Sequence, residues 1–375
     1  MTNPDVSIRG AGAVGLALAL SLARQGLAVQ LVDGPAPGTT GPTGIRGPDV
    51  RTYALNAASR ALLTQLKVRD ALPPDAVTAV DDMAVAGDAA GAQIDFSAWQ
   101  QGAEALAWIV DAAALEDALA TAARYAPHLS RSAVESPAAL RVLAEGKASA
   151  SRDALGVHWQ RQAYGQTALA ARLVSDQPHA HLARQWFRCP DVLALLPFDR
   201  PQPAHSYGLV WSLPAERCQA LLDAPVAEFE AALAEATAGA AGGLRLASAR
   251  AAWPLAVAQA QPLSGPGWVL VGDAAHVVHP LAGQGLNLGL ADVVALSAVI
   301  AQREPWRALG DERLLRRYGR QRAAPTRVMA LVTDGLLHLF AQPQPAVKEL
   351  RNRGMGLLNH LAPLKRARTQ RALDA

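Results

Sequence analysis

The feature that most constrains the fold of this 375-residue chain is a glycine-rich turn close to its N-terminus. Residues 6–9 have the composition of a short buried strand, the turn Gly10–Gly15 reads GAGAVG, and residues 16–24 have helical composition. A second apolar strand, residues 28–32, then ends at Asp33. A G-x-G-x-x-G turn between a strand and a helix, with an acid about 20 residues further on, is typical of a dinucleotide-binding βαβ unit. The sequence therefore predicts an α/β domain that binds a dinucleotide.

Each residue type in this turn has a physical reason. Gly10 permits the tight turn, Gly12 lets the backbone approach a pyrophosphate, and Gly15 lets the helix pack closely on the strand. The helix N-terminus offers free N–H groups and the positive end of a dipole to the phosphates, while Asp33 can accept hydrogen bonds from ribose hydroxyls. The predicted dinucleotide contacts here are Gly10, Gly12, Ala13, Val14, Gly15 and Asp33. The motif alone does not distinguish NAD from FAD.

A second strand, acid and glycine turn lie in the last third of the chain. Residues 267–271 (GWVLV) have the composition of a buried strand, Gly-Asp follows at 272–273, and GQG at 283–285 opens an apolar helix over 286–300. This unit lies too far along the chain to belong to the first mononucleotide half, so a ligand that touches both must be long, and FAD fits. Asp273 then holds the ribityl hydroxyls. The GQG turn lies against the flavin pyrimidine edge, where backbone N–H groups and the helix dipole stabilise the negative charge of reduced flavin.

Composition excludes several classes of protein. Hydrophobic residues make up 51% of the chain and the net charge is +3, as in a packed globular protein. Cys189 and Cys218 are too few for a disulfide framework and have no metal-binding spacing, which suits a reducing cytoplasm. The apolar run at residues 14–23 is too short to span a bilayer. The chain has no interleaved aromatic and basic residues of the kind that indicate nucleic-acid binding. From the cysteine content we expect a cytoplasmic protein.

The C-terminal end of the chain is basic. Its cations are Lys348, Arg351, Arg353, Lys365, Arg366, Arg368 and Arg371. Three interpretations are open: contact with the inner face of an anionic membrane, contact with an acidic partner protein, or a solvated helix face, of which the last is the simplest.

The second glycine unit resembles a known family. Gly272-Asp273-Ala274-Ala275-His276, His279-Pro280 and Ala282-Gly283-Gln284-Gly285-Leu286-Asn287 are similar to the flavin signature of the aromatic-ring hydroxylases. Within these, the run most resembles the ubiquinone-biosynthesis FAD-dependent hydroxylases, whose pattern GDAAHxxHPLAGQGLNLGLxD is matched through Asp292. The resemblance implies FAD contacts at Gly272, Asp273, Pro280, Gly283, Gln284, Gly285, Leu286 and Asn287. It also implies a Rossmann-like FAD-binding domain, α/β in class within an α+β chain, with an inserted antiparallel-sheet substrate domain and C-terminal helices.

Asp273, His276 and His279 are spaced at i, i+3 and i+6, which by itself is compatible with a zinc or non-haem iron site. In the family that the chain resembles, the aspartate is engaged by the ribityl chain and the following segment passes beside the flavin. We therefore expect no metal here. His276 and His279 are interpreted as structural residues that hydrogen-bond the backbone near the cofactor.

Two further segments resemble family motifs. Residues 49–55 (DVRTYAL) are similar to DxRxxAL, and by that likeness Arg51 lies near the cofactor; the alternative is an exposed loop arginine. Residues 145–152 (EGKASASR) are similar to DGxxSxxR, a motif that in the family helps to position FAD and the incoming nicotinamide cofactor. Here Glu145 replaces the aspartate. The prediction of reduction by NAD(P)H therefore has less support in the sequence than the prediction of FAD binding.

The chain departs from the family pattern in two more places. Ala112–Ala114 replace polar residues that in the family face the cofactor. Residues 130–139 form a link rich in Ser, Ala and Pro where family members carry additional antiparallel strands, so we expect a smaller sheet beside the FAD domain.

The middle of the chain has the pattern of an antiparallel sheet with helices. Strands are predicted at residues 157–162, 167–174, 185–187, 193–197 and 207–213, and helices at 214–217 and 228–236. Trp186 and Trp211 are interpreted as core rather than cavity residues, and residues 250–255 as the return to the FAD domain. Helices follow at 314–322 and 326–340. We predict a discontinuous FAD-binding domain (1–75, 106–155 and 263–310), a substrate domain (76–105 and 156–262) and a C-terminal helical region (311–375).

The resemblance implies a monooxygenase. NADH or NADPH reduces the FAD, dioxygen forms a flavin C4a-hydroperoxide, and an oxygen atom is transferred to an aromatic ring, which in this family is a polyprenylated phenol of ubiquinone biosynthesis. Two alternatives stay open: an FAD-dependent dehydrogenase or reductase acting on a lipid, and a weakly active or non-catalytic FAD-fold subunit of a quinone-biosynthesis assembly. No residue has the context of a general base, so no catalytic residue is assigned. The sequence does not determine which ring carbon is hydroxylated, how long the prenyl tail of the substrate is, or whether NADH or NADPH is used. It does not determine the oligomeric state either.

Overall fold

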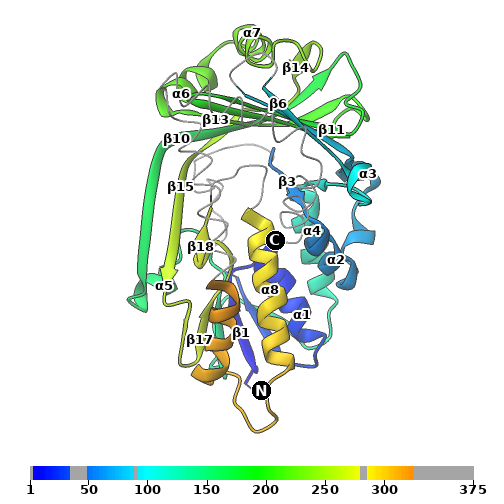
Figure 1. Cartoon of the computed structure of the whole chain (residues 1–375). Helices are drawn as coiled ribbons and strands as arrows, with labels where there is room; N and C mark the ends of the chain where they lie inside the picture. The colour runs from blue at the N-terminus through cyan, green and yellow to red at the C-terminus, as the bar shows by residue number, and fades with distance from the viewer. Residues whose placement is uncertain (1–2, 34–48, 88–91, 279–284, 324–375) are drawn as a thin grey trace.

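The computed structural model describes residues 3–33, 49–87, 92–278 and 285–323. Two large sheets, one above the other in Figure 1, organise this part of the chain. The lower sheet has six strands in the order β16-β17-β9-β1-β2-β8, and all its neighbours are parallel except β16 and β17. Its strands are β1 (Val6–Arg9), β2 (Val29–Val32), β8 (Leu129–Ser132), β9 (Leu140–Leu143), β16 (Ser264–Gly265) and β17 (Trp268–Leu270).

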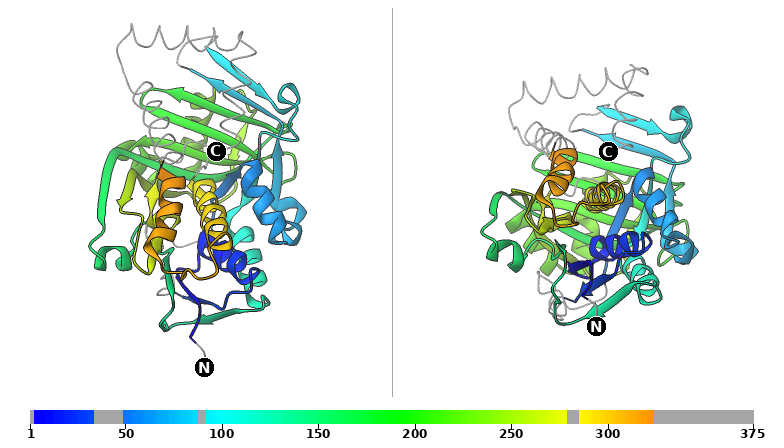
Figure 2. Two further views of the ribbon diagram at one scale, coloured as in Figure 1. Left: turned by 60° about the horizontal axis from the view of Figure 1, so that its bottom comes forward. Right: turned by 90° about the horizontal axis from the view of Figure 1, so that it is seen from below.

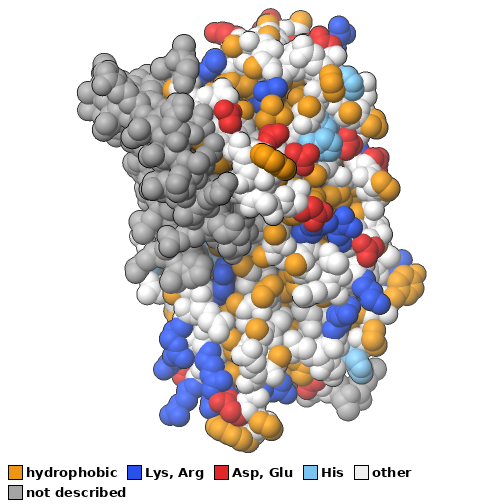
Figure 3. All heavy atoms as spheres, turned by 45° about the vertical axis from the view of Figure 1, so that its right-hand side comes forward, with side chains coloured by type: hydrophobic (Ala, Val, Ile, Leu, Met, Phe, Trp, Pro, Cys, Tyr) orange, Lys and Arg blue, Asp and Glu red, His pale blue; other side chains and the backbone are white. Residues whose placement is uncertain are grey.

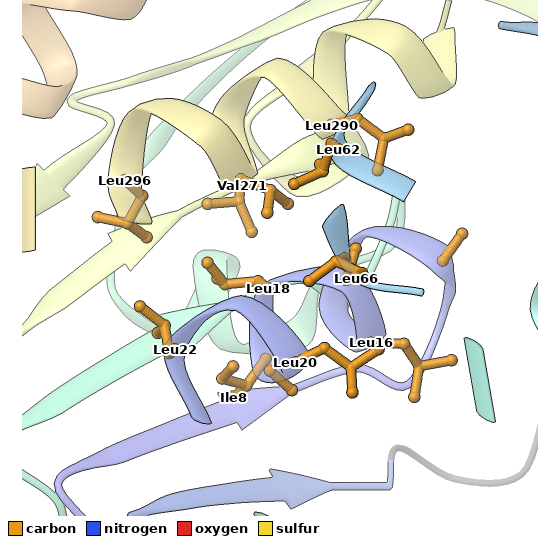
Figure 4. Packing of buried hydrophobic residues seen from close by; sticks show 14 of the residues in the cluster. Ile8, Leu16, Leu18, Leu20, Leu22, Leu62, Leu66, Val271, Leu290 and Leu296 are labelled. Atoms are coloured by element: carbon orange, nitrogen blue, oxygen red, sulfur yellow. The ribbon is translucent and has the colours of Figure 1, made fainter. Parts of the chain in front are cut away.

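Helices pack on the lower sheet and close its core. Helix α1 (Ala13–Ala23) is apolar nearly all round, as expected for a helix that is covered on several sides. It lies between the sheet, α4 (Ala112–Arg124) and α8 (Gly285–Ala301). In Figure 4, leucines of α1 lie near Leu290 and Leu296 of α8 and near Leu62 of α2 (Ala57–Gln65), and all of them belong to one buried hydrophobic cluster. In both views of Figure 2, α8 lies between α1 and the helical residues 312–323.

The upper sheet is mainly antiparallel and runs β18-β15-β10-β13-β12-β11-β5-β6, with β14 paired to β10. Its strands are β5 (Asp82–Ala86), β6 (Gln93–Ser97), β10 (His158–Ser175), β11 (Leu182–Arg188), β12 (Asp191–Phe198), β13 (Ser206–Pro214), β14 (Leu244–Leu246), β15 (Ala251–Gln261) and β18 (His276–Val277). Helices α6 (Ala215–Asp223) and α7 (Val226–Thr237) cover its upper face (Figure 1). Trp186 and Trp211 are buried in the core beneath them, as predicted.

A three-stranded sheet, β3-β7-β4, stands beside the two large ones. Its strands are β3 (Thr52–Leu55), β4 (Val77–Val80) and β7 (Ala107–Asp111). The remaining short elements are α3 (Ala98–Gln101), α5 (Ala150–Ala154) and the 3₁₀ turns η1 (Arg69–Ala71), η2 (Pro74–Ala76) and η3 (Gly272–Ala274). A parallel α/β layer combined with a mainly antiparallel sheet confirms the predicted fold class.

Three predicted boundaries are wrong. The strands predicted at 157–162 and 167–174 form one strand, β10, because a bulge opposite β15 between Ala163 and Thr167 absorbs the polar interruption. Gly165, with φ +68°, supplies the backbone conformation that the bulge needs. The link predicted at 130–139 begins inside strand β8, which pairs with β2 at the sheet edge. The segment 250–255 is part of β15 in the upper sheet, and the chain returns to the lower sheet only at β16.

Residues 312–323 are helical, close to the prediction of 314–322. The helix predicted at 326–340 and the basic C-terminal end lie outside the described residues. Within the described part of the chain, no helix combines the length and the apolar character that crossing a membrane requires.

Candidate cofactor site

The first glycine turn has the geometry that the sequence predicts. Gly10 has φ +110°, and a Cβ atom there would lie 2.3 Å from the carbonyl oxygen of Ala144. A Cβ atom on Gly15 would lie 2.0 Å from the carbonyl oxygen of Gly10. A Cβ atom on Gly12, in contrast, would meet no atom within 4 Å. Gly15 is therefore required by the turn itself, and Gly10 by its positive φ and by the close approach of Ala144. The open space beside Gly12 and the first N–H groups of α1 suit an approaching phosphate.

Asp33 directly follows β2, and its carboxylate lies at the carboxyl edge of the lower sheet. Its Oδ1 atom is 2.6 Å from a guanidinium nitrogen of Arg131, which belongs to the neighbouring strand β8. Both side chains are partly exposed. Sequence reasoning missed Arg131, because its role depends on the pairing of β8 with β2.

The two half-sites meet at one packing contact. Gly272 has φ +61° and begins η3, directly after β17. A Cβ atom on Gly272 would lie 3.2 Å from a methyl group of Val14, and one on Gly289 of α8 would lie 2.5 Å from Val14 Cγ2. Val14 belongs to the first turn of α1. The tertiary structure thus brings the N-terminal turn, the Gly-Asp turn and α8 into direct contact, so a single extended ligand can reach all three.

Asp273 is half-buried next to this contact. Burial raises the pKa of its carboxyl group, although the positive charges of Lys147, His276 and Arg51 act in the opposite direction. The guanidinium of Arg51 donates hydrogen bonds to both carboxylate oxygens of Asp49, the shortest at 2.6 Å, and lies 3.5 Å from Glu116. Arg51 is close enough to Asp273 for its positive charge to lower the pKa of that carboxyl group. A half-buried carboxylate among cations is chemically suited to accept hydrogen bonds from ligand hydroxyls.

The start of α8 is held by Asn287. Its side-chain oxygen accepts a hydrogen bond from the N–H group of Asn56 (3.1 Å), and its side-chain nitrogen donates to the carbonyl oxygen of Ala54 (2.7 Å). These two hydrogen bonds tie the start of α8 to β3 and to the residue that follows it, and they leave one N–H group and one lone pair of the amide for a further partner. Leu286 is buried. The predicted contacts Pro280, Gly283 and Gln284 lie outside the described residues.

The segment 145–152 is bound to the protein by its polar side chains. The carboxylate of Glu145 accepts hydrogen bonds from the hydroxyl groups of Ser149 (2.6 Å) and Ser151 (2.9 Å) and pairs with Arg9 at 3.2 Å. Arg152 is buried against the ring of Trp159 and lies 3.4 Å from the carbonyl oxygen of Ala274. The longer side chain at position 145 is thus accommodated by hydrogen bonds, and the segment is linked to the second half-site.

A cavity of about 690 Å³ lies between α4 and the upper sheet. The carboxylate of Asp111, which also caps α4, lies 2.9 Å from Arg172 of β10 and 3.6 Å from Arg200, and all three residues line the cavity. Sequence reasoning missed this cluster. The one signal was a charged residue at position 172 within the otherwise apolar run of residues 168–174.

His276 differs from its prediction. Its Nε2 atom lies 2.7 Å from the carboxylate of Asp292, so its partner is a buried acid and not the backbone. The physical reason is that the fold brings Asp292 of α8 against His276 of β18, a tertiary contact that the local sequence does not specify. Among the described residues, no three His, Cys, Asp or Glu side chains converge in a way that could hold a metal ion. His279 lies outside those residues.

Comparison with known proteins decides the family. A family model described as an FAD binding domain matches residues 112–333. Ubiquinone hydroxylase UbiL of Rhodospirillum rubrum is 30% identical over 389 residues, which cover 96% of this chain and 87% of that protein. The 3-demethoxyubiquinol 3-hydroxylase of Escherichia coli is also 30% identical, over the full length of both proteins. The chain belongs to the FAD-dependent hydroxylases of ubiquinone biosynthesis.

Solved structures agree with this assignment at the level of the fold. The probable FAD-dependent monooxygenase PqsL of Pseudomonas aeruginosa superposes with a TM-score of 0.73 at 20% identity, covering 94% of this chain and 99% of that one. The p-nitrophenol 4-monooxygenase PnpA of Pseudomonas putida gives 0.73 at 16% identity, covering 99% and 96%. As a member of the hydroxylase family, the protein is an FAD-dependent monooxygenase, and the predicted cofactor is confirmed.

Proposed function

We propose that this hydroxylase inserts one oxygen atom of dioxygen into the aromatic ring of a polyprenylated phenol on the ubiquinone pathway. The observation that carries the proposal is the contact of Val14 with Gly272 and Gly289, which joins two distant motifs into one cofactor site. The names of the relatives, a ubiquinone hydroxylase and a 3-demethoxyubiquinol 3-hydroxylase, support the class of substrate. When bound, FAD takes electrons from NADH or NADPH and activates oxygen.

The chain's own residues bind and orient this cofactor. The backbone at Gly12 and the N-terminus of α1 bind the diphosphate, and Asp33 binds the adenosine ribose. Asp273 holds the ribityl hydroxyls, and Arg51 supplies a positive charge on the same side. The backbone at 285–287 and the N-terminal end of α8 stabilise negative charge at the pyrimidine edge of the ring.

The proposed domain boundaries follow from these roles. Residues 1–75, 106–155 and 263–310 form the cofactor domain, and residues 76–105 and 156–262 form the substrate domain. The strands of the lower sheet fall in the first set and most strands of the upper sheet in the second, which supports the division. Two short strands cross the division. β18 pairs with β15 of the upper sheet from within the cofactor segment, and β4 of the substrate segment pairs with β7 of the cofactor segment.

The test of this function starts from the flavin. Wild-type protein, Asp273→Ala and the control Asp223→Ala, an exposed residue of α6, are purified, and their visible spectra are recorded with and without added FAD. We expect Asp273→Ala to lose FAD and the control to keep it; equal retention would refute the ribityl assignment. Oxygen uptake that depends on NAD(P)H and rises with a prenylphenol supports the hydroxylase. Turnover without oxygen would favour a dehydrogenase, and a wild-type protein that binds no FAD would favour a non-catalytic subunit.

We also propose peripheral contact with an anionic membrane, through the end of the molecule that carries residues 302–323. Arg313, Arg316 and Arg320 are exposed and follow the spacing of one helix face, and Trp306 in the adjoining loop is 76% exposed. Figure 3 shows Lys and Arg side chains gathered at the lower end of the molecule. Basic and aromatic side chains together favour the interface of anionic lipid.

Vesicle sedimentation tests this contact. We expect the wild-type protein to bind vesicles that contain phosphatidylglycerol and not vesicles of phosphatidylcholine alone. The double variant Trp306→Ala/Arg313→Gln should bind less, while Tyr125→Ala, which removes another exposed aromatic residue, should bind like wild type. Equal binding to both kinds of vesicle, or no binding, would contradict the proposal.

A further inference from the structure

A buried ionic cluster lies directly behind the Gly272-Asp273 turn. At its centre is Asp292 of α8, whose side chain is completely buried. Its Oδ2 atom accepts a hydrogen bond from the backbone N–H group of Gly272 (2.8 Å) and lies 2.7 Å from Nε2 of His276. Its Oδ1 atom accepts a hydrogen bond from Nε of Arg322 (2.6 Å). One carboxylate therefore binds three segments of the chain.

The third segment is the helix of residues 312–323, which follows α8 in the chain and lies beside it in Figure 2. Arg322 also donates to the carbonyl oxygen of Leu288 (3.2 Å), and Tyr318 donates to the carbonyl oxygen of Leu270 at the end of β17 (3.0 Å). This helix therefore contacts both the strand that leads into the Gly-Asp turn and the helix that follows it.

The cluster is held together by charge. Burial by itself would raise the pKa of Asp292, but His276, Arg322 and the N–H group of Gly272 outweigh it, so the pKa is lowered and the carboxylate is ionised. Burial by itself would lower the pKa of His276, but Asp292 outweighs it and the pKa is raised. Hydrogen bonds between ionised partners are shorter and stronger than neutral ones, and removing one partner leaves the others buried and unpaired.

Gly272 is the residue at which this cluster meets the cofactor site. Its φ of +61° places it in the left-handed region, and it leaves little room for a side chain beside Val14, while a Cβ atom on Gly289 would lie 3.4 Å from its Cα. Asp273 follows it directly, so the direction of the Asp273 carboxylate depends on how the Gly272 peptide is oriented. The hydrogen bond from Gly272 to Asp292 fixes that orientation.

We propose that Asp292 is a positioning residue for FAD: it fixes the Gly272 backbone so that Asp273 faces the ribityl chain, and through Arg322 it makes cofactor affinity depend on the helix of residues 312–323. This inference rests on the proposed placement of FAD at Asp273. It predicts that a residue without any contact to the cofactor controls cofactor affinity, and that it does so only through Asp273.

The experiment is a double-mutant cycle on the full chain. FAD dissociation constants are measured by titrating apoprotein and following flavin fluorescence, at a temperature where circular dichroism shows every variant folded. The variants are Asp292→Asn, Asp273→Ala and the two combined, with Asp223→Asn as an exposed control. Asparagine keeps the size of the side chain but replaces one acceptor oxygen by a donor, so it cannot satisfy all three partners.

We expect Asp292→Asn to weaken FAD binding by about tenfold or more, the effect of losing one charge-assisted hydrogen bond that holds the site. In the Asp273→Ala background the same change should weaken binding by less than about twofold, because the residue that it positions is gone. Arg322→Gln should follow the same pattern, and it serves as the second variant if Asp292→Asn does not fold.

Three results would overturn the inference. An Asp292→Asn protein that melts at a lower temperature but binds FAD as tightly as wild type would make the cluster purely structural. Equal losses in both backgrounds would mean that Asp292 acts independently of Asp273. Wild-type affinity in Asp273→Ala alone would refute the placement of FAD itself, and that outcome is distinguishable because it needs no change at Asp292.

Discussion

Replacing Gly289 by alanine tests whether the two half-sites form one cofactor site. The new methyl group would be placed 2.5 Å from Val14 Cγ2 and 3.4 Å from the Cα atom of Gly272. Carbon atoms pack at about 3.5–4.0 Å, so α1 and α8 would have to separate by about 1 Å. Val14 cannot turn away easily, because β-branched side chains have few allowed rotamers and its other methyl group already lies against Gly272.

The magnitude follows from two opposing effects. Overpacking of this kind costs about 1–3 kcal/mol, and alanine in place of glycine within a helix recovers about 0.5–1 kcal/mol. We therefore expect the free energy of unfolding of the apoprotein to fall by about 1 kcal/mol. FAD affinity should fall by about tenfold or more, because a shift of about 1 Å separates the diphosphate end of the site from the ribityl end.

Urea unfolding of the apoprotein and FAD titration measure the two effects separately. Gly319→Ala is the matched control, because a Cβ atom there meets nothing within 4 Å and the residue is also helical; it should stabilise the protein slightly and leave FAD binding unchanged. Val14→Ala combined with Gly289→Ala removes the clashing methyl groups and should restore much of the affinity. Wild-type FAD affinity in Gly289→Ala alone would refute the reasoning.

Other changes have equally specific outcomes. Gly15→Ala should lower the free energy of unfolding by about 3 kcal/mol, because its methyl group would lie 2.0 Å from the Gly10 carbonyl oxygen, and urea titration checks this. Gly12→Ala should unfold like wild type yet bind FAD weakly, because its methyl group meets no protein atom within 4 Å and fills space left for the phosphates; normal FAD affinity would contradict that role. The pKa of His276 is raised in the folded protein, so its contribution to stability is fully present below about pH 6.5 and is lost as the pH rises through the folded-state pKa. Unfolding measured from pH 6 to 9 should show stability falling by at most about 1.4 kcal/mol per pH unit from this proton, and His276→Gln should remove that component.

The features of this protein that have a local cause could be predicted from its amino-acid sequence. A strand, a glycine turn and a helix that follow one another directly can be recognised without knowing what surrounds them, since the positive φ of Gly10 and the close approach of Gly15 to the Gly10 carbonyl oxygen arise within a few residues. The Gly-Asp turn after β17 can be recognised in the same way. The family resemblance carried by residues 272–292 then predicted the class of cofactor and of reaction. Periodicity also located β10, β11, β12 and β13 of the upper sheet, although it divided β10 where a bulge carries the ladder through, and it missed the sheet's other strands.

How these parts are joined could not be predicted, because it depends on contacts between residues far apart in the chain. Val14 meets Gly272 and Gly289, and Asp292 binds Gly272, His276 and Arg322, across distances in the chain that no local pattern can connect. Asp111 of β7 likewise lies beside Arg172 of β10 and Arg200, which follows β12, only because the fold brings these segments together. The physical reason is that a buried charge needs a partner but does not specify where in the sequence that partner lies. The partner is determined by how α8 and the helix of residues 312–323 pack in the fold, because this packing places Asp292 beside Arg322.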